Sequence, residues 1–117
     1  MSHGRGDQSI FLRSSRDIEH VKEHGRRIST VLFNMLVCRI DGRGSRVGIV
    51  VGKRFGIAVR RNRAKRLFRE LTRQVQTELV SGHDVVVFPK RDALGVSFEE
   101  LKATWVNTFR RQGLIRS

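Results

Sequence analysis

The longest periodic pattern of apolar residues in the chain lies between residues 58 and 79. Apolar side chains recur there three or four positions apart, which is the spacing of one side of an α-helix. Since successive residues are about 100° apart around a helix, a polar set falls on the opposite side. The pattern predicts a helix from Ala58 to Leu79 with one buried side and one basic side. The buried side comprises Ala64, Leu67, Phe68, Leu71, Val75 and Leu79, and the basic side comprises Asn62, Lys65, Arg66, Arg69 and Arg73.

A shorter helix is predicted from residues 16 to 24. Ser15 is the expected N-cap, because a serine oxygen accepts hydrogen bonds from the free N–H groups of a first helical turn. Gly25 is the expected stop signal. Ile18 and Val21 are three positions apart and should both face the core.

The last helix is predicted to begin after Ser97, because Ser97-x-x-Glu100 is a capping box. Trp105 is in register with the apolar stripe of this helix, so a core role is favoured over stacking on a nucleic-acid base. The stripe should pack on a sheet and comprises Phe98, Leu101, Trp105 and Phe109.

Three apolar runs predict β-strands. The runs 28–40 and 46–51 are separated by a Gly-rich turn at 41–44, which indicates an antiparallel hairpin. The run 84–88 ends at Pro89 and follows the long helix, so it should join the sheet parallel to one hairpin strand. Alternation places Phe33, Met35 and Val37 on one face of the sheet, and Asn34, Leu36 and Cys38 on the other.

Composition adds a charge asymmetry to this α/β outline. The 117-residue chain has 24 Lys and Arg residues against 11 Asp and Glu. Nine of the bases and a single acid, Glu70, fall within residues 52–73. Because acids at i, i+4 spacing are otherwise missing there, a bound phosphate backbone explains the basic side better than solvation alone. A polyanion, and nucleic acid in particular, is the expected partner.

Other features narrow the class of protein. No apolar run approaches the 18 residues of a membrane span, and the start of the chain lacks the apolar core of a signal peptide, so a cytoplasmic protein is expected. Cys38 has no partner for an internal disulfide. Residues 1–9 are expected to be a disordered arm, in which Arg5-Gly6-Asp7 is a chance match to an adhesion motif, and residues 10–117 a single domain.

Two enzyme motifs are incomplete. Residues 20–24 match the H-x-x-E-H pattern of some zinc proteases, but no acid-rich helix follows to supply a third ligand. Residues 48–54 resemble a phosphate-binding P-loop, but the glycines are one residue too close, and Arg54 replaces the magnesium-binding Ser or Thr. No paired carboxylates, Ser/His/Asp set or Cys cluster is evident. We therefore assign no catalytic residue and no metal site to the protein.

The segment that begins the long helix, residues 52–70, reads GKRFGIAVRRNRAKRLFRE. It closely resembles the signature of the protein subunit of bacterial ribonuclease P, K-[KR]-x-G-x-A-V-x-R-N-R-x-K-R-x-x-R-[EQ]. The surrounding order is similar too, from the opening LR-S-x-D…HG to the last helix. The resemblance covers residues 10–112.

The resemblance implies a two-layer α/β sandwich of order α-β-β-β-α-β-α, with the basic helix in a left-handed crossover. It also implies a subunit of a ribonucleoprotein that removes the 5′ leader of precursor tRNA, with hydrolysis performed by the catalytic RNA and its magnesium. The single RNA-binding domain would bind the catalytic RNA and precursor tRNA, with no cofactor of its own, no membrane and no obligate protein partner. The expected contacts to the catalytic RNA are Lys53, Arg54, Arg61, Asn62, Arg63, Lys65, Arg66, Arg69 and Arg73.

By the same resemblance, the 5′ leader would lie in a cleft between the first helix and the sheet. Family members line this cleft partly with aromatic side chains, whereas Leu36 here replaces a common strand tyrosine, and Ile57 replaces a usual asparagine nearby. Because base stacking contributes about 1–3 kcal/mol per base, fewer rings predict weaker or altered leader contacts. The expected cleft residues are Ile18, Lys22, Phe33, Asn34, Leu36 and Val50.

Two other functions stay open from the sequence. A general binder of structured RNA, or a ribosome-associated protein, would use the same helix without promoting cleavage by the catalytic RNA. A self-sufficient nuclease would cut precursor tRNA alone, and the scarcity of clustered acids argues against it.

Overall fold

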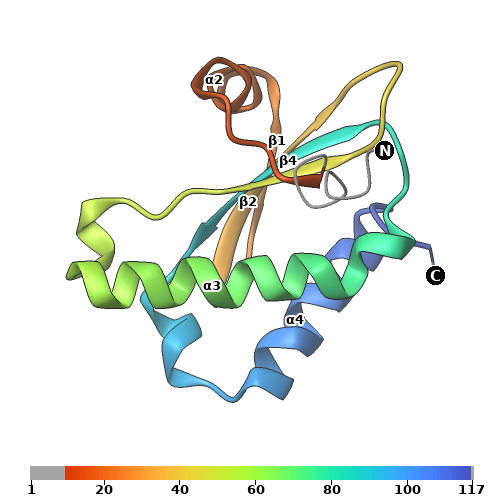
Figure 1. Cartoon of the computed structure of the whole chain (residues 1–117). Helices are drawn as coiled ribbons and strands as arrows, with labels where there is room; N and C mark the ends of the chain where they lie inside the picture. Colours follow the sequence, from red (N-terminus) through yellow and green to blue (C-terminus); the bar gives the residue numbers. More distant parts are fainter. Residues whose placement is uncertain (1–9, 117) are drawn as a thin grey trace, which may run out of the picture.

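A four-stranded sheet with helices on both faces is formed by residues 10–116, the part of the chain that the computed structural model describes (Figure 1). The predicted arm at residues 1–9, including Arg5-Gly6-Asp7, lies outside the described residues, as does Ser117. The predicted order α-β-β-β-α-β-α is confirmed. The elements are α2 (Ser15–His24), β1 (Arg26–Ser29), β2 (Phe33–Arg39), β3 (Arg46–Ile49), η2 (Lys53–Phe55), α3 (Ala58–Val75), η3 (Gln76–Glu78), β4 (His83–Pro89), η4 (Arg91–Gly95) and α4 (Phe98–Arg111), where η marks a short 3-10 helix.

The sheet has the strand order β1-β2-β4-β3, so the predicted hairpin of β2 and β3 is wrong. β4 lies between these two strands, antiparallel to β2 and parallel to β3. The reason is the burial of Val85, Val86 and Val87, which are covered on both faces of the sheet and therefore require a central strand. The predicted parallel pairing of the last strand is confirmed in the β3–α3–β4 unit, whose left-handed sense stays a prediction.

The hairpin of this fold is formed by β1 and β2, because a turn at Thr30 divides the run predicted at residues 28–40. The Thr30 hydroxyl donates to the Phe33 carbonyl oxygen at 2.7 Å and accepts from the Phe33 N–H at 2.9 Å. It also accepts from the Leu32 N–H at 3.2 Å. A threonine side chain thus closes the turn without the Gly or Pro that usually signals one.

The main core lies between the sheet and the pair of helices α3 and α4 (Figure 1). Its centre is aromatic: the Phe33 ring centroid is 5.8 Å from that of Phe68 and 5.4 Å from that of Trp105. All three side chains are fully buried, which confirms the predicted core role of Trp105 and the buried side of α3. α3 ends at Val75, earlier than predicted, because the chain tightens into η3 and Leu79 then pairs with Ile115 in an isolated β-bridge.

α2 covers part of the other face of the sheet, where Val21 packs with Leu12, Cys38 and Val86. The N-cap is Ser14, one residue before the predicted Ser15, and its hydroxyl oxygen accepts from the Asp17 N–H at 3.4 Å. Cys38 is buried in this cluster. Burial, aided by the Asp84 carboxylate, raises the pKa of its thiol above the ordinary 9.0.

The segment before α2 lies directly on the edge of β3. The Leu12 N–H donates to the Val47 carbonyl oxygen at 2.9 Å, and Phe11 forms a parallel bridge with Val47. Gly48 permits this close approach, because a Cβ atom there would lie 2.9 Å from the Leu12 carbonyl oxygen. The start of the domain is thereby fixed beside α3.

Candidate nucleic-acid interface

The exposed side of α3 carries four cations, Arg63, Lys65, Arg66 and Arg69, that have no acidic partner among residues 10–116. Asn62, Arg63, Arg66 and Arg69 are exposed and Lys65 is half-buried, so the predicted basic side does face solvent. Among residues 10–116, no carboxylate lies within 4.0 Å of these four cations. The only acid of the helix, Glu70, lies 4.0 Å from Arg73.

Arginines elsewhere are used differently. Arg46 donates two hydrogen bonds to the buried Asp84 carboxylate, at 3.0 and 2.8 Å, and lies 3.4 Å from the Asp17 carboxylate of α2. Arg43 donates to the same Asp84 at 3.1 Å. The hydrogen bond to Asp84 raises the pKa of Arg46 above its ordinary value. These guanidinium groups tie α2 and the β2–β3 loop to β4, whereas Arg63, Lys65, Arg66 and Arg69 of α3 make no such ion pair within residues 10–116.

The start of α3 is held by Arg61, whose Nη1 donates to the Gly56 carbonyl oxygen at 2.7 Å. Gly56 has a φ of 148°, in a region that side chains disfavour, so glycine is required at this turn. Gly52, the N-cap of η2, has an ordinary φ of −82°. Ile57 occupies the N-cap and offers no side-chain oxygen to the first N–H groups of the helix. Half-buried Arg61 is therefore partly structural, unlike exposed Asn62 and Arg63.

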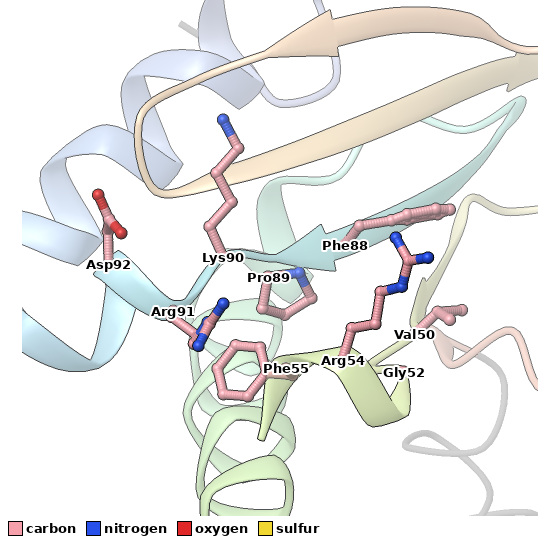
Figure 2. A pocket seen from close by; sticks show the side chains of 9 residues that line it. All are labelled: Val50, Gly52, Arg54, Phe55, Phe88, Pro89, Lys90, Arg91 and Asp92. Atoms are coloured by element: carbon pink, nitrogen blue, oxygen red, sulfur yellow. The ribbon is translucent and has the colours of Figure 1, made fainter.

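Lys53 and Arg54 are exposed on η2, which buried Phe55 anchors to the domain. The two residues differ in surroundings. The Arg54 side chain extends toward Val50 and Phe88, into a hollow beside β4 (Figure 2). Arg54 thus lies between the exposed side of α3 and a second candidate surface.

This second surface is formed by two adjoining hollows that share Phe88, and we name it the Phe88 groove. The larger hollow has a volume of about 470 Å³ and lies at the end of β4 (Figure 2). The smaller, of about 60 Å³, lies between Arg27 and Phe88. Cations exceed acids, since Asp92 is the one acid among the lining residues. The residues lining the groove are Arg27, Asn34, Met35, Leu36, Val50, Gly52, Arg54, Phe55, Phe88, Pro89, Lys90, Arg91 and Asp92.

The six residues predicted for the leader cleft are not all brought together. Asn34, Leu36 and Val50 line the Phe88 groove. Ile18 packs against the cluster beneath α2, and Lys22 is exposed on α2 with its Nζ 3.4 Å from the Glu19 carboxylate. Phe33 is fully buried on the opposite face of the sheet, as alternation along β2 requires for the neighbour of Asn34. Phe33 therefore belongs to the core and not to the groove.

Phe88 and Arg27 were not among the predicted site residues. The signal for Phe88 was its alternation with Val86, which places both on the α2 face of the sheet. Arg27 is opposite Leu36 in the β1–β2 register, so its position depends on a strand pairing that was not predicted. Within the described chain, the Asn34 Oδ1 atom is buried beside the groove without a hydrogen-bond partner.

The described residues, 10–116, contain no group of three or more His, Cys, Asp or Glu side chains able to hold a metal ion. The two histidines of the H-x-x-E-H match stack with ring centroids 4.5 Å apart, and His24 Nδ1 lies 3.1 Å from the His20 carbonyl oxygen. No helix within the same residues is long and apolar enough to cross a membrane.

A small α/β domain with an exposed row of arginines and a basic groove containing an aromatic ring defines a nucleic-acid-binding protein. The sequence matches the Ribonuclease P family over residues 7–113. The chain therefore belongs to the ribonuclease P protein family, the protein component of an endoribonuclease, as the resemblance predicted. Nothing in these comparisons favours the alternative of a general RNA-binding protein.

Known proteins support the assignment in sequence and in fold. A ribonuclease P protein component from Bacillus cereus strain AH187 is 37% identical over 108 residues, covering 90% of this chain and 92% of that protein. The RNase P protein from Thermotoga maritima is 31% identical, with a TM-score of 0.77 over 86% of this chain and 96% of that one. An RNase P protein mutant from Staphylococcus aureus reaches a TM-score of 0.84 over 97% and 95%, and at 19% identity it shows the fold alone.

Proposed function

We propose that this chain binds the catalytic RNA of ribonuclease P through the exposed side of α3, and the 5′ leader of precursor tRNA in the Phe88 groove. In this proposal the RNA, with magnesium, hydrolyses the phosphodiester bond in the cytoplasm, and the protein supplies binding alone. The observation that supports it best is the row of α3 cations that have no carboxylate partner among the described residues.

A rigid helix suits this role because successive turns place cations about 5.4 Å apart along one line. Guanidinium groups bind phosphate through two parallel hydrogen bonds, and Asn62 can bond a phosphate, a 2′-hydroxyl or a base edge. Arg61 contributes less freely, since it already bonds the Gly56 carbonyl oxygen. The proposed contacts are Lys53, Arg54, Arg61, Asn62, Arg63, Lys65, Arg66, Arg69 and Arg73.

The Phe88 groove fits a single strand, because it combines one aromatic ring with several cations. Phe88 offers a ring on which a leader base can stack, and Arg27 and Arg91 can neutralise phosphates beside it. Leu36 and Val50 line the groove, and Lys22 is proposed to extend it along α2, whereas Ile18 lines a separate hollow beside α3. Phe33 is left out because it is buried in the main core.

Reconstitution tests the function directly. At low magnesium, the full-length protein should restore site-specific 5′ cleavage of precursor tRNA by the catalytic RNA, and the protein alone should cut nothing. A site-specific cut without the RNA would contradict the proposal that the RNA performs the hydrolysis. Equal binding to unrelated structured RNAs, with no rescue of cleavage, would favour a general RNA-binding protein instead.

The leader site is tested by Phe88→Ala, with Phe88→Leu as a control that keeps apolar bulk without a ring. Loss of one stacked base should weaken binding of leader-bearing precursor tRNA to the holoenzyme by about 1–3 kcal/mol. Affinity for a tRNA without a leader, and for the catalytic RNA itself, should not change. If both variants bind the leader as the wild type does, Phe88 is not a stacking platform.

A further inference from the structure

A separate hollow of about 180 Å³ lies between α3, β3 and the segment before α2, and we name it the Arg13 hollow. Its floor is apolar and its rim carries three cations, contributed by the N-terminal segment and by α3. No acid lines it, and it shares no lining residue with the Phe88 groove. Its lining residues are Phe11, Leu12, Arg13, Ile18, Val47, Ile49, Lys65 and Arg69.

Phe11 explains why Arg13 is held at this rim. Its side chain is only 6% exposed, and the guanidinium carbons of Arg13 and Arg73 lie 5.9 and 5.6 Å from its ring centroid. Cations within about 6 Å of a ring centroid are attracted to the ring face. Since the backbone of Leu12 is also bonded to β3, the segment is fixed in place. A residue far from α3 in the sequence thereby joins the cations of that helix.

The size and chemistry of the hollow suit one nucleobase. Pockets for drug-sized ligands measure about 300–1,000 Å³, so a volume of about 180 Å³ suits a smaller group. Proteins commonly bind RNA bases that are splayed out of loops or bulges, by apolar contact and by stacking on guanidinium planes. A flat basic surface that contacted only a duplex backbone would need no such cavity.

We infer that the Arg13 hollow receives one unstacked nucleotide of the catalytic RNA, with its base over Ile18 and Ile49 and against the Arg13 guanidinium plane, and with its phosphate among the rim cations. The inference rests on the proposed function of α3. The source is the catalytic RNA and not precursor tRNA, because Lys65 and Arg69 make the hollow continuous with the exposed side of α3. Arg13 and Phe11 thus join the interface, the first as a contact and the second as a positioning residue.

Filling the hollow with a larger side chain tests whether a base occupies it. Ile49 is half-buried, so Ile49→Phe adds volume there without changing charge. With full-length wild-type protein bound, one unpaired base of the catalytic RNA should become protected from base-specific chemical modification. Ile49→Phe should restore the reactivity of that base and weaken binding by roughly fivefold to a hundredfold, as expected for one lost stacking contact. The slope of log affinity against log salt should not change, because no phosphate contact is lost.

Two substitutions of Arg13 separate charge from stacking. Arg13→Ala should flatten the salt slope by about 0.7–0.9, the value of one phosphate contact. Arg13→Lys should keep the slope yet expose the protected base, since an ammonium group has no plane for stacking. The matched control is Arg110→Ala on α4, which removes one exposed charge and should leave both measurements as in the wild type.

Thermal unfolding establishes whether each variant folds. If Ile49→Phe does not fold, the two Arg13 variants test the inference in its place. The inference is overturned if the wild type binds the catalytic RNA without protecting any single base, or if folded Ile49→Phe keeps the protection. Protection that appears only after precursor tRNA is added would also overturn it. In each of these cases the proposed function survives, whereas a wild-type protein that does not bind the catalytic RNA refutes both.

Discussion

The two long helices of this protein pack on the same face of the sheet, yet they follow opposite rules at their surfaces. α4 obeys the rules that govern helix ends. The Ser97 hydroxyl oxygen caps it by accepting from the Glu100 N–H at 3.1 Å, and Glu99 and Glu100 lie in its first turn. Arg110 and Arg111 lie in its last turn, where cations complement the helix dipole.

α3 breaks these rules at its N-terminus. Its N-cap residue, Ile57, makes no capping bond, and its first turn has no acid. Arg60 and Arg61 stand there instead, at the end where the dipole disfavours positive charge. Both helices bury the apolar residues of their inner sides, so the contrast between them concerns their exposed ends. Departures from stability rules of this kind are expected where a surface serves function.

The largest expected effects test the similarity of the buried sides. Phe68→Ala on α3 and Trp105→Ala on α4 each remove a fully buried ring from one aromatic cluster, in which the two centroids are 5.6 Å apart. Each should lower the free energy of unfolding by about 3–5 kcal/mol. Chemical denaturation measures this. A much smaller loss for Phe68→Ala would mean that α3 is held less firmly than α4.

Removal of the α4 cap should have a moderate effect. Ser97→Ala should cost about 1 kcal/mol of unfolding free energy, because the Glu100 N–H loses its acceptor. Affinity for the catalytic RNA should stay at the wild-type value. If RNA binding falls while the fold is intact, α4 contributes to RNA binding and is not a purely structural helix.

Addition of a cap to α3 should raise the free energy of unfolding, whereas removal of the α4 cap lowers it. Ile57 is 67% exposed and has extended backbone angles, so an asparagine there can accept from the first turn without loss of buried area. Ile57→Asn should raise the free energy of unfolding by up to about 1 kcal/mol. Ile57→Ala, which removes apolar bulk without adding an acceptor, is the control. No gain over that control would show that the first turn is already satisfied.

The smallest effects on stability, and the clearest on function, belong to the exposed side of α3. Arg66→Ala and Arg69→Ala should each change unfolding free energy by less than about 0.5 kcal/mol. Each should also flatten the salt dependence of binding to the catalytic RNA by about 0.7–0.9 log-log units. Lys102→Ala, an exposed cation of α4, should leave the slope unchanged. Equal salt slopes for all three variants would mean that α3 and α4 do not differ in their contribution to RNA binding.

Local patterns predicted much of this protein. Helical spacing predicted the two sides of α3 and the core role of Trp105, and the chemistry of helix ends predicted the cap at Ser97. Both kinds of pattern depend only on residues a few positions apart. The signature around Arg61, Asn62 and Arg63 narrowed the polyanion to the RNA of one family. The sequence also predicts that Phe33 and Asn34 lie on opposite faces of the sheet, because neighbouring side chains on a strand point to opposite faces.

Tertiary structure decided what depends on non-local pairing. Apolar periodicity shows which residues are inside, but it does not state which strand lies beside which, so the insertion of β4 between β2 and β3 was missed. That insertion brings Phe88 beside Asn34 and creates the groove. In the same way, only the packing of the N-terminal segment on β3, permitted by Gly48, brings Arg13 to Lys65 and Arg69. The sequence by itself determined that α3 presents a basic side to solvent, and the fold decided which distant residues lie beside that side.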